Sequence, residues 1–150
     1  MKIMVATDGS RGSTAALNFA ARLASDERGS ELVVLTVDSG NGASHAGAGA
    51  EDDNSNSRSA ARKVLDKASR DMKERGAGAS YQVVTARRPD EVPEAISREA
   101  DRLKADLVVV GSGGRDTLSE WVLGGTALRL IYVARRPVTV VRPPRRRKAS

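Results

Sequence analysis

The chain has 150 residues, 39% of them hydrophobic and 29% charged, which is the composition of one folded domain rather than of a disordered chain. It contains no cysteine and a single histidine, which excludes disulfides, thiolate metal centres, cysteine nucleophiles and multi-histidine metal sites. The net charge of +6 is concentrated at the end, because the last nine residues hold five basic side chains and residues 1–141 hold 20 basic and 19 acidic ones.

The chain begins with a predicted strand, a turn and a helix. The apolar run Lys2–Thr7 indicates a buried strand, and the following Asp8-Gly9-Ser10 is typical of a turn. Apolar residues recur at helical spacing over Ser13–Ala24, with Ser10 or Ser13 available as the N-cap. Gly29 is expected to end this helix.

A second strand, a long loop and a second helix come next. The apolar run Glu31–Val37 predicts the strand. Residues 38–57 are rich in Gly, Ser, Asn and acidic residues without periodicity, so we expect a flexible loop, with His45 as a solvated residue inside it. The apolar stripe from Ala61 to Met72 predicts a helix that ends at the glycines following it.

The central part of the chain predicts strand, helix and strand. Tyr81–Ala86 and Ala105–Val110 are short apolar runs, and each is expected to be a strand. Between them, Val92–Leu103 predicts a helix with Pro93 in its first turn, where the missing N–H group does little harm.

The last part predicts a glycine-rich connection, a helix and an edge strand. The segment 111–125 is glycine-rich. A helix is expected over Thr126–Ala134, and Pro137–Val141 predicts a strand whose first proline suits the edge of a sheet. The apolar residues that this helix is expected to bury are Leu128, Leu130, Ile131 and Val133.

Strands and helices alternate throughout, and the strands are continuous apolar runs rather than alternating patterns. This combination predicts an α/β fold, a single Rossmann-like domain in which a five-stranded parallel sheet carries helices on both faces. We expect the domain to cover residues 1–142 and a basic tail to cover residues 143–150.

Two segments are expected at the carboxyl edge of the sheet, where parallel sheets bind ligands. One is Asp8 with its neighbours, after the first strand, and the other is the glycine segment that starts at Gly111, after the fourth. Free N–H groups in a glycine-rich turn and at a helix start favour an anion. The segment has no P-loop lysine, so by these criteria alone a ligand-free connection stays open.

The spacing of these glycines resembles the motif G-x2-G-x9-G-[ST] of nucleotide-binding members of the universal stress protein family. Gly111, Gly114 and Gly124 match its three glycines. The segments VATDGS, VGSGG and RPVTVVRPP are also similar to that family, so the resemblance extends over nearly the whole chain except the segment 38–57 and the tail.

The resemblance implies an adenosine nucleotide, ATP or AMP, over the carboxyl edge of the sheet. Asp8 would contact the ribose, or a Mg²⁺ ion bound with the nucleotide, since a carboxylate beside phosphates is repelled by them. The resemblance also implies a homodimer through the last strand, Pro137–Val141. Adenine would lie against Ala6, Thr7 and Val37, and the phosphates against Gly111, Gly114, Gly124, Gly125 and Thr126, with Arg115, Arg87 or Arg88 as candidate cations.

One departure from the motif weakens this expectation. Gly125 stands where the family has Ser or Thr, which removes a hydroxyl worth on the order of 1–3 kcal/mol toward a charged acceptor. The leading hypothesis is a nucleotide-binding stress protein without catalytic residues, and the alternatives are a nucleotide-free interaction protein of the same fold and a slow ATPase.

The basic tail adds a further alternative. Arg142, Arg145, Arg146, Arg147 and Lys148 favour phosphate polymers, so nucleic acid is a candidate partner through the tail alone, although a solvated tail is the simpler interpretation. No apolar run is long enough to cross a membrane and no signal sequence opens the chain. We therefore expect a cytoplasmic protein without a membrane partner.

Overall fold

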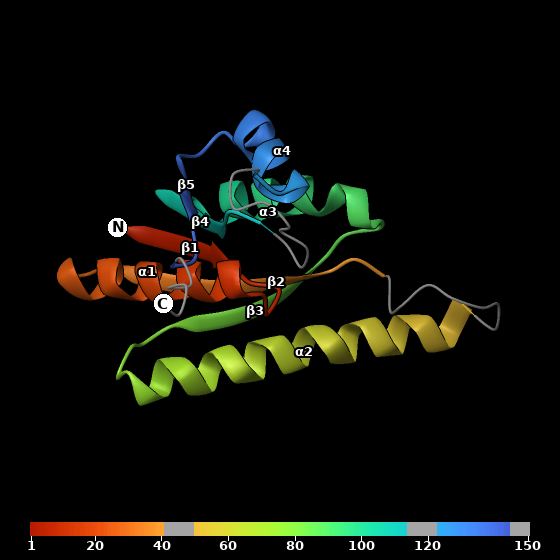
Figure 1. The fold of residues 1–150 in the computed structure, drawn as a ribbon, viewed down its shortest axis with the longest axis horizontal. Coiled ribbons are helices and arrows are strands. Elements are labelled where there is room, and N and C mark those ends of the chain that lie inside the picture. Colours follow the sequence, from red (N-terminus) through yellow and green to blue (C-terminus); the bar gives the residue numbers. More distant parts are fainter. Residues whose placement is uncertain (41–49, 114–122, 145–150) are drawn as a thin grey trace, which may run out of the picture.

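Five parallel strands form one sheet in the order β3-β2-β1-β4-β5 in a computed structural model that describes residues 1–40, 50–113 and 123–144 (Figure 1). The α/β fold and the parallel sheet predicted from the sequence are confirmed. The strands pair in register, with Val5 opposite both Val34 and Val109 at the centre of the sheet. The strands are β1 (Lys2–Ala6), β2 (Glu31–Asp38), β3 (Ser80–Thr85), β4 (Leu107–Gly111) and β5 (Val138–Val141).

Helices cover both faces of the sheet (Figure 1). One face is covered by α1 (Arg11–Asp26) and α2 (Ala50–Glu74), and the other by α3 (Val92–Leu103) and α4 (Gly125–Val133). A short 3-10 turn, η1 (Pro89–Glu91), precedes α3. The central strands are therefore buried on both faces, which explains why they are apolar runs.

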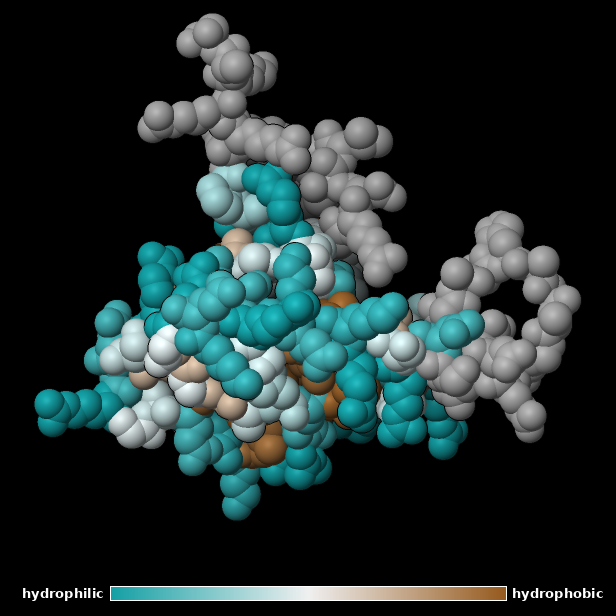
Figure 2. Space-filling model, turned by 90° about the horizontal axis from the view of Figure 1, so that it is seen from below, coloured by the Kyte–Doolittle hydropathy of each residue, from teal (hydrophilic) through white to brown (hydrophobic). Residues whose placement is uncertain are grey.

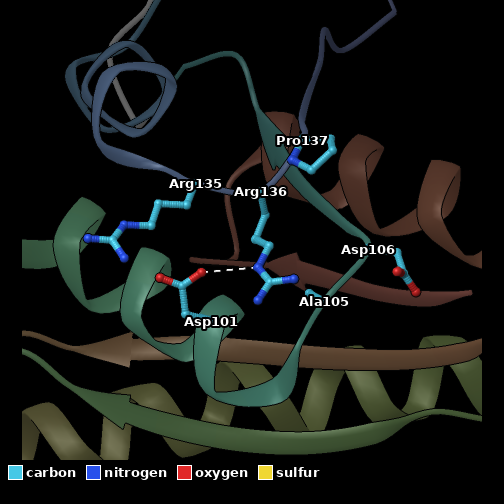
Figure 3. A pocket seen from close by; sticks show the side chains of 6 residues that line it. All are labelled: Asp101, Ala105, Asp106, Arg135, Arg136 and Pro137. Carbon is cyan, nitrogen blue, oxygen red and sulfur yellow. Dashed lines mark hydrogen bonds and ion pairs between the residues drawn. The ribbon is translucent and has the colours of Figure 1, made fainter.

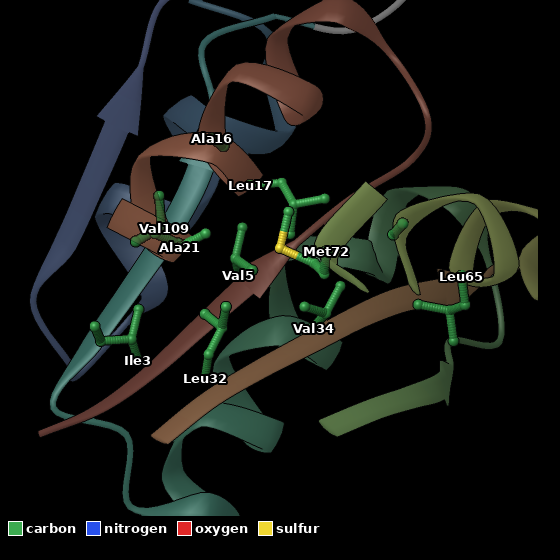
Figure 4. Close-up of a cluster of buried hydrophobic side chains, with 12 residues drawn as sticks. Ile3, Val5, Ala16, Leu17, Ala21, Leu32, Val34, Leu65, Met72 and Val109 are labelled. Atoms are coloured by element: carbon green, nitrogen blue, oxygen red, sulfur yellow. The ribbon is translucent and has the colours of Figure 1, made fainter. Parts of the chain in front are cut away.

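The core under α1 and α2 is built almost entirely from aliphatic side chains, because the chain has few aromatic residues (Figure 4). Met72 is fully buried, and in Figure 4 it lies between Leu17 of α1 and Val34 of β2. On the opposite face, Ile96 of α3 and Leu130 of α4 pack on β1, β2 and β4. The two clusters fix the helices against the sheet from both sides.

The predicted loop over residues 38–57 is wrong at both ends. Asp38 belongs to β2, and α2 already begins at Ala50, so Ala50–Ser57 is helical. Once the stripe of α2 is packed on the sheet, each added helical residue costs little, since propagation is far easier than nucleation. Ser57 is itself buried, so the packed face reaches beyond the apolar stripe. Residues 41–49, including His45, lie outside the described residues.

The exposed surface on the α2 side is mostly hydrophilic, with hydrophobic areas confined to the gaps between polar side chains (Figure 2). Ala61, Leu65, Ala68 and Met72 of α2 are buried in the core. The helix is therefore amphipathic, as its stripe predicts. Within the part of the chain that the structure describes, no helix is long and apolar enough to cross a membrane.

The prediction of which apolar residues α4 buries is only half correct. Leu130 and Ala127 are buried against the sheet, whereas Leu128 and Ile131 are 44% and 46% exposed and Tyr132 is 80% exposed. A nine-residue helix on one edge of a sheet buries a single narrow face, and this face contains Ala127 and Leu130 at i, i+3 spacing. Leu128, Ile131 and Tyr132 form an exposed patch, whereas Val133 is half-buried and packs against the core.

The N-terminus of α1 lies directly on the end of β4, without side chains between the two backbones. A Cβ atom added at Gly111 would lie 2.4 Å from the carbonyl carbon of Gly12 and 2.7 Å from the nitrogen of Ser13. A Cβ at Gly12 would lie 3.0 Å from the carbonyl oxygen of Gly113. Gly111 is therefore required for this backbone contact, and a side chain at Gly12 would fit only tightly.

Gly111→Ala is expected to lower the free energy of unfolding by at least about 2 kcal/mol, because the new methyl group meets backbone atoms that cannot rotate away. Urea unfolding measures the change. The matched control is Gly125→Ala, because a Cβ at Gly125 meets nothing within 4 Å. This control should leave stability unchanged or raise it by up to about 1 kcal/mol. Equal stability of Gly111→Ala and the wild type would contradict the close approach.

Candidate functional site

The turn between β1 and α1 is held by a small cluster of hydroxyl groups. The Ser10 hydroxyl accepts a hydrogen bond from the backbone N–H of Ser13 at 3.2 Å and caps α1. Thr7 Oγ1 and Ser13 Oγ share a hydrogen bond of 3.1 Å in the buried interior of the turn. Gly9 has a φ of +83°, a conformation that favours glycine. The carboxylate of Asp8 accepts from the Ser10 N–H at 2.9 Å. The backbone geometry therefore fixes the position of Asp8.

The end of β4 is connected both to β5 and to the start of α4. Ser112 N donates to Val141 O at 2.9 Å, and Gly124 N donates to Ser112 O at 2.7 Å. Gly124 is the N-cap of α4 and supplies no side-chain cap. In residues 1–40, 50–113 and 123–144, no acceptor meets the N–H groups of Gly125, Thr126 and Ala127. N–H groups without an acceptor among the described residues, together with the positive end of the helix dipole, favour an anion at this position.

The two segments enclose one pocket of about 540 Å³ at the carboxyl edge of the sheet. It is amphipathic: one part is lined by aliphatic side chains and the other by hydroxyls, glycines and one carboxylate. The aliphatic part consists of Ala6, Val37, Val92, Ile96, Val110 and Ala127. The polar part consists of Thr7, Asp8, Ser10, Ser13, Thr36, Ser39, Gly111, Gly113, Gly124, Gly125 and Thr126.

Most of the residues singled out from the sequence line this one pocket. They come from strands that are not consecutive in the chain, and they meet because β1 pairs with β4. Gly114 and Arg115 lie outside the described residues. The predicted residues that line the pocket are Ala6, Thr7, Asp8, Val37, Gly111, Gly124, Gly125 and Thr126.

The arginines of the β3–α3 connection do not line the pocket. Arg88 pairs instead with Asp90 at 3.3 Å and with Glu91 at 3.4 Å, next to η1. Arg87 is exposed and is likewise absent from the pocket wall. Among the described side chains, the pocket wall therefore contains no cation.

The sequence did not predict that α3 lines the pocket. Val92 and Ile96 stand one helical turn apart and line the aliphatic part of the pocket. In the sequence they are indistinguishable from core residues, and only the position of α3 over the end of the sheet exposes them to the pocket. Ser13 was expected only as a cap, and it lines the pocket as well, together with Ser10 of the turn predicted at this edge.

Ion pairs hold α3 in this position. Glu99 accepts a hydrogen bond from Gln82 Nε2 of β3 at 2.7 Å and forms an ion pair with Arg102. The Arg102 guanidinium, and secondarily the Gln82 amide, hold the pKa of Glu99 below its ordinary value against the opposing effect of burial. Glu94 pairs with Arg129 of α4 at 2.6 Å, and this hydrogen bond lowers the pKa of Glu94. These interactions link α3 to β3 and to α4.

A second pocket lies at the opposite, amino edge of the sheet, before β4 and β5 (Figure 3). Arg136 reaches across it to Asp101 at 3.0 Å, and Arg135 points away from that pair in Figure 3. Asp106 accepts a hydrogen bond from the Lys2 N–H at 2.7 Å. These contacts tie the α4–β5 connection and the start of β4 to their neighbours, so we assign this region to the fold rather than to ligand binding.

The described residues contain no group of three or more His, Asp or Glu side chains positioned to hold a metal ion. Asp8 is the only carboxylate in the described wall of the carboxyl-edge pocket. A divalent ion in this pocket would therefore need ligands from a bound phosphate in addition to Asp8.

Comparisons with known proteins match one family over most of the chain. The model of the Universal stress protein family matches residues 1–142. A universal stress protein family structure from Burkholderia pseudomallei is 30% identical, with 95% of this chain and 96% of that chain covered and a TM-score of 0.71. No match was found among curated proteins.

Two further structures are described as nucleotide complexes. The universal stress protein from Archaeoglobus fulgidus in complex with dAMP is 27% identical, with 94% of this chain and 97% of that chain covered and a TM-score of 0.64. An Arabidopsis thaliana family protein with AMP bound is 20% identical, with coverages of 96% and 92% and a TM-score of 0.67. At that identity the Arabidopsis structure shows the shared fold.

Because the folded-state pKa of Glu99 is lowered, its ion pair stabilises the fold above the unfolded pKa and loses this effect as the pH falls through the folded pKa. Glu99→Gln should therefore destabilise the protein by up to about 1 kcal/mol near neutral pH and by less near about pH 3. Urea unfolding at both pH values measures the difference. Glu74→Gln is the control, since Glu74 is exposed and forms no ion pair with the described residues. A pH-independent effect of Glu99→Gln would be evidence against the ion pair.

Proposed function

This chain belongs to the universal stress protein family, and we propose that it binds an adenine nucleotide, AMP or ATP, in the pocket at the carboxyl edge of its sheet. The observation that carries the proposal is the division of this pocket into an aliphatic part and a part with N–H groups that meet no acceptor among the described residues. A nucleotide has the same division, with an apolar face on its base and negative charge on its phosphates. The nucleotide complexes of related proteins support the proposal.

The base would lie in the aliphatic part, between Val37 of β2 and the Val92 and Ile96 side chains of α3. A flat ring buried among aliphatic side chains gains roughly 25 cal/mol for each Å² of apolar surface removed from water. The Thr7 N–H already donates to Leu35 O at 2.9 Å. Recognition of the adenine edge would therefore use other backbone groups around Ala6 and Val37.

The phosphates would lie against Gly111, Gly124, Gly125 and Thr126, with Gly114 and Arg115 as the remaining candidates from the motif. The N–H groups of the first turn of α4 are the donors that support this placement. Glycines let a phosphate approach the backbone closely. Asp8 would accept a hydrogen bond from the ribose, or hold a Mg²⁺ ion together with the phosphates.

Binding rather than hydrolysis is the proposed activity, with slow ATP hydrolysis at most. Asp8 is the only ionisable side chain in the described pocket wall, and its ribose role leaves no general base for the phosphates among these described residues. We propose that the nucleotide acts by stabilising one conformation, because a ligand that binds only the folded chain raises its stability. The proposed location is the cytoplasm and the proposed context is a stress response.

A second candidate function is a nucleotide-free interaction protein of the same fold. The observation that favours it is Gly125, which removes the hydroxyl that the family motif supplies to the phosphates. A missing hydroxyl lowers affinity without closing the pocket, so we prefer the nucleotide-binding proposal.

We also propose a homodimer through Pro137–Val141. β5 is an edge strand, and Val108 N donates to Pro137 O while Ser112 N donates to Val141 O. The alternate residues Val138 and Val140 therefore direct their backbone groups to the open edge. The exposed Leu128, Ile131 and Tyr132 patch on the adjacent α4 adds apolar surface that a second copy would cover.

Thermal unfolding with and without millimolar AMP, ATP and Mg-ATP tests nucleotide binding. A rise in melting temperature with adenine nucleotides but not with guanine nucleotides is expected, because a bound ligand stabilises the folded chain and the glycine spacing resembles that of adenine-nucleotide binders. An unchanged melting temperature with every adenine nucleotide would refute the nucleotide-binding proposal and favour the nucleotide-free interaction protein.

Gly125→Ser should tighten AMP binding by about tenfold, since a Cβ at this position meets nothing and the added hydroxyl can reach a charged phosphate oxygen. Isothermal titration calorimetry measures the change. Gly125→Ala is the matched control, since it adds the Cβ and the helix propensity without the hydroxyl. If the alanine variant gains as much affinity as the serine variant, the hydroxyl is not the cause.

Val140→Pro should shift the protein from dimer to monomer, because it removes an outward N–H group that is not bonded to β4. Val140→Thr keeps that N–H group and should remain dimeric. Tyr132→Asp is a second variant, placed at an exposed side chain where it leaves the fold intact. Sedimentation equilibrium across the micromolar range gives the state, and a monomeric wild type would refute the proposed dimer.

A further inference from the structure

We infer that Thr36 is a ligand-binding residue: its hydroxyl donates a hydrogen bond to a ribose hydroxyl of the nucleotide and makes the pocket select ribonucleotides. This inference rests on the proposed nucleotide binding. Thr36 lies near the carboxyl end of β2 and lines the carboxyl-edge pocket. It is the one polar residue between the two ends of an otherwise apolar strand.

The first observation is that the Thr36 hydroxyl is buried without a protein partner. The residue is only 3% exposed, and its side chain forms no hydrogen bond with the described residues. A buried hydroxyl without a hydrogen bond destabilises a protein. This hydroxyl is not sealed in the core, as the unpaired buried oxygens of Ser30 and Glu94 are. The pocket that Thr36 lines is the space into which it opens.

The second observation is that the neighbouring hydroxyls are already bonded to one another. Thr7 Oγ1 and Ser13 Oγ share their hydrogen bond of 3.1 Å, and Ser10 Oγ donates to Ser13 Oγ at 3.2 Å. Ser39 and Thr126 also line the pocket, but they are half-buried and exposed, so water can satisfy their hydroxyls. Within the described wall, the β2 threonine is therefore the one buried hydroxyl that is left for a ligand.

The third observation is the face of the sheet on which Thr36 lies. Val34 of β2 packs in the core under α1 and α2, and Leu35 packs in the core under α3 and α4. Since successive side chains of a strand point to opposite faces, Thr36 lies on the α1 side and Val37 on the α3 side. The base would lie against Val37. The Thr36 hydroxyl therefore meets the part of the ligand that is joined to the base on the α1 side, which is the sugar.

Asp8, the proposed ribose ligand, lies on the neighbouring strand end. The N–H group of Thr7 donates to Leu35 O at 2.9 Å, which continues the pairing of β1 with β2 and places Thr7 opposite Thr36. Asp8 is the next residue of the chain. Neighbouring strands lie about 4.8 Å apart, so one sugar between the two side chains reaches both of them.

The two side chains complement the hydroxyl pair of a ribose. An ionised carboxylate only accepts hydrogen bonds, so Asp8 takes the proton of a ribose hydroxyl. A ribose oxygen is then left as an acceptor, and the Thr36 hydroxyl is the donor that faces it. A sugar without these hydroxyls leaves Thr36 unpaired again. A site built to bond a ligand hydroxyl rejects the analogue that lacks it.

The test changes the protein and the ligand in one thermodynamic cycle. Thr36→Val keeps the shape of the side chain and removes its hydroxyl. Isothermal titration calorimetry compares AMP with 2′,3′-dideoxy-AMP, whose sugar has neither ribose hydroxyl. Thr36→Val should weaken AMP binding about five- to tenfold and leave the affinity for 2′,3′-dideoxy-AMP unchanged.

The stability of the free protein gives a second readout that a structural hydroxyl would move in the opposite direction. Thr36→Val should raise the melting temperature without nucleotide by about 2–4 °C, because it removes a buried hydroxyl that has no partner. Thr36→Ser keeps the hydroxyl and loses a methyl group. This variant should lower the melting temperature while retaining the preference of the wild type for AMP over the dideoxy nucleotide.

The matched control is Thr139→Val in β5. Thr139 lies on the same face of the sheet as Thr36, because Val141, two residues further along, packs in the core under α1. It is absent from the described pocket wall. The control should therefore retain the AMP affinity of the wild type, and an equal loss of affinity in the control would overturn the inference.

Three further outcomes would overturn the inference while leaving nucleotide binding intact. One is an equal loss of affinity for AMP and for 2′,3′-dideoxy-AMP in Thr36→Val, which would move the contact from the sugar to another part of the ligand. The others are an unchanged AMP affinity and a lowered melting temperature of this variant without nucleotide. Absence of binding of AMP and every other adenine nucleotide to the wild type is a different result, because it refutes the proposed function itself.

Discussion

The backbone contact between Gly12 and Gly111 is the constraint on which the site depends. A side chain at Gly111 would collide with backbone atoms of α1, so only a glycine at this position allows the helix to start directly on the end of β4. This contact places the hydroxyl-rich turn after β1 beside the glycines after β4. The parallel pairing of β1 with β4 also brings these two segments together, because both strands end at the same edge of the sheet. A pocket between them follows from both contacts.

The pocket owes its two chemical parts to the layers of the fold. The aliphatic part is the end of the core under α3, where Val92 and Ile96 extend the buried face of the helix past the last residues of β2. The polar part exists because a helix starts at Gly125 without a side-chain cap and leaves backbone donors that meet no acceptor in the part of the chain that the structure describes. Interactions between α3, α4 and β3 keep these parts at a fixed separation. A ligand that is apolar at one end and anionic at the other fits this arrangement.

Sequence patterns predicted the order of the elements well because each signal is local. The helix Val92–Leu103 was predicted at its exact bounds, since Pro93 marks its first turn and its apolar residues recur at helical spacing. The prediction failed where distant packing decides the outcome. α2 continues back to Ala50 through a segment of loop-like composition, and Leu128 and Ile131 stay exposed because α4 buries one narrow face. Neither result can be read from the residues of the segment alone.

The sequence by itself determined the α/β fold, the family and the candidate residues Asp8, Gly111 and Gly124, because periodicity, turn signals and motif spacing are properties of short stretches of chain. Only the tertiary structure decided that these residues share one pocket, that α3 lines it and that Arg88 does not. It also brought the start of the basic tail to the same edge of the sheet, through the parallel course of β5 and the hydrogen bond from Arg11 to Pro144. Contacts between residues far apart in the chain depend on strand order and helix packing, and neither is encoded in any single segment.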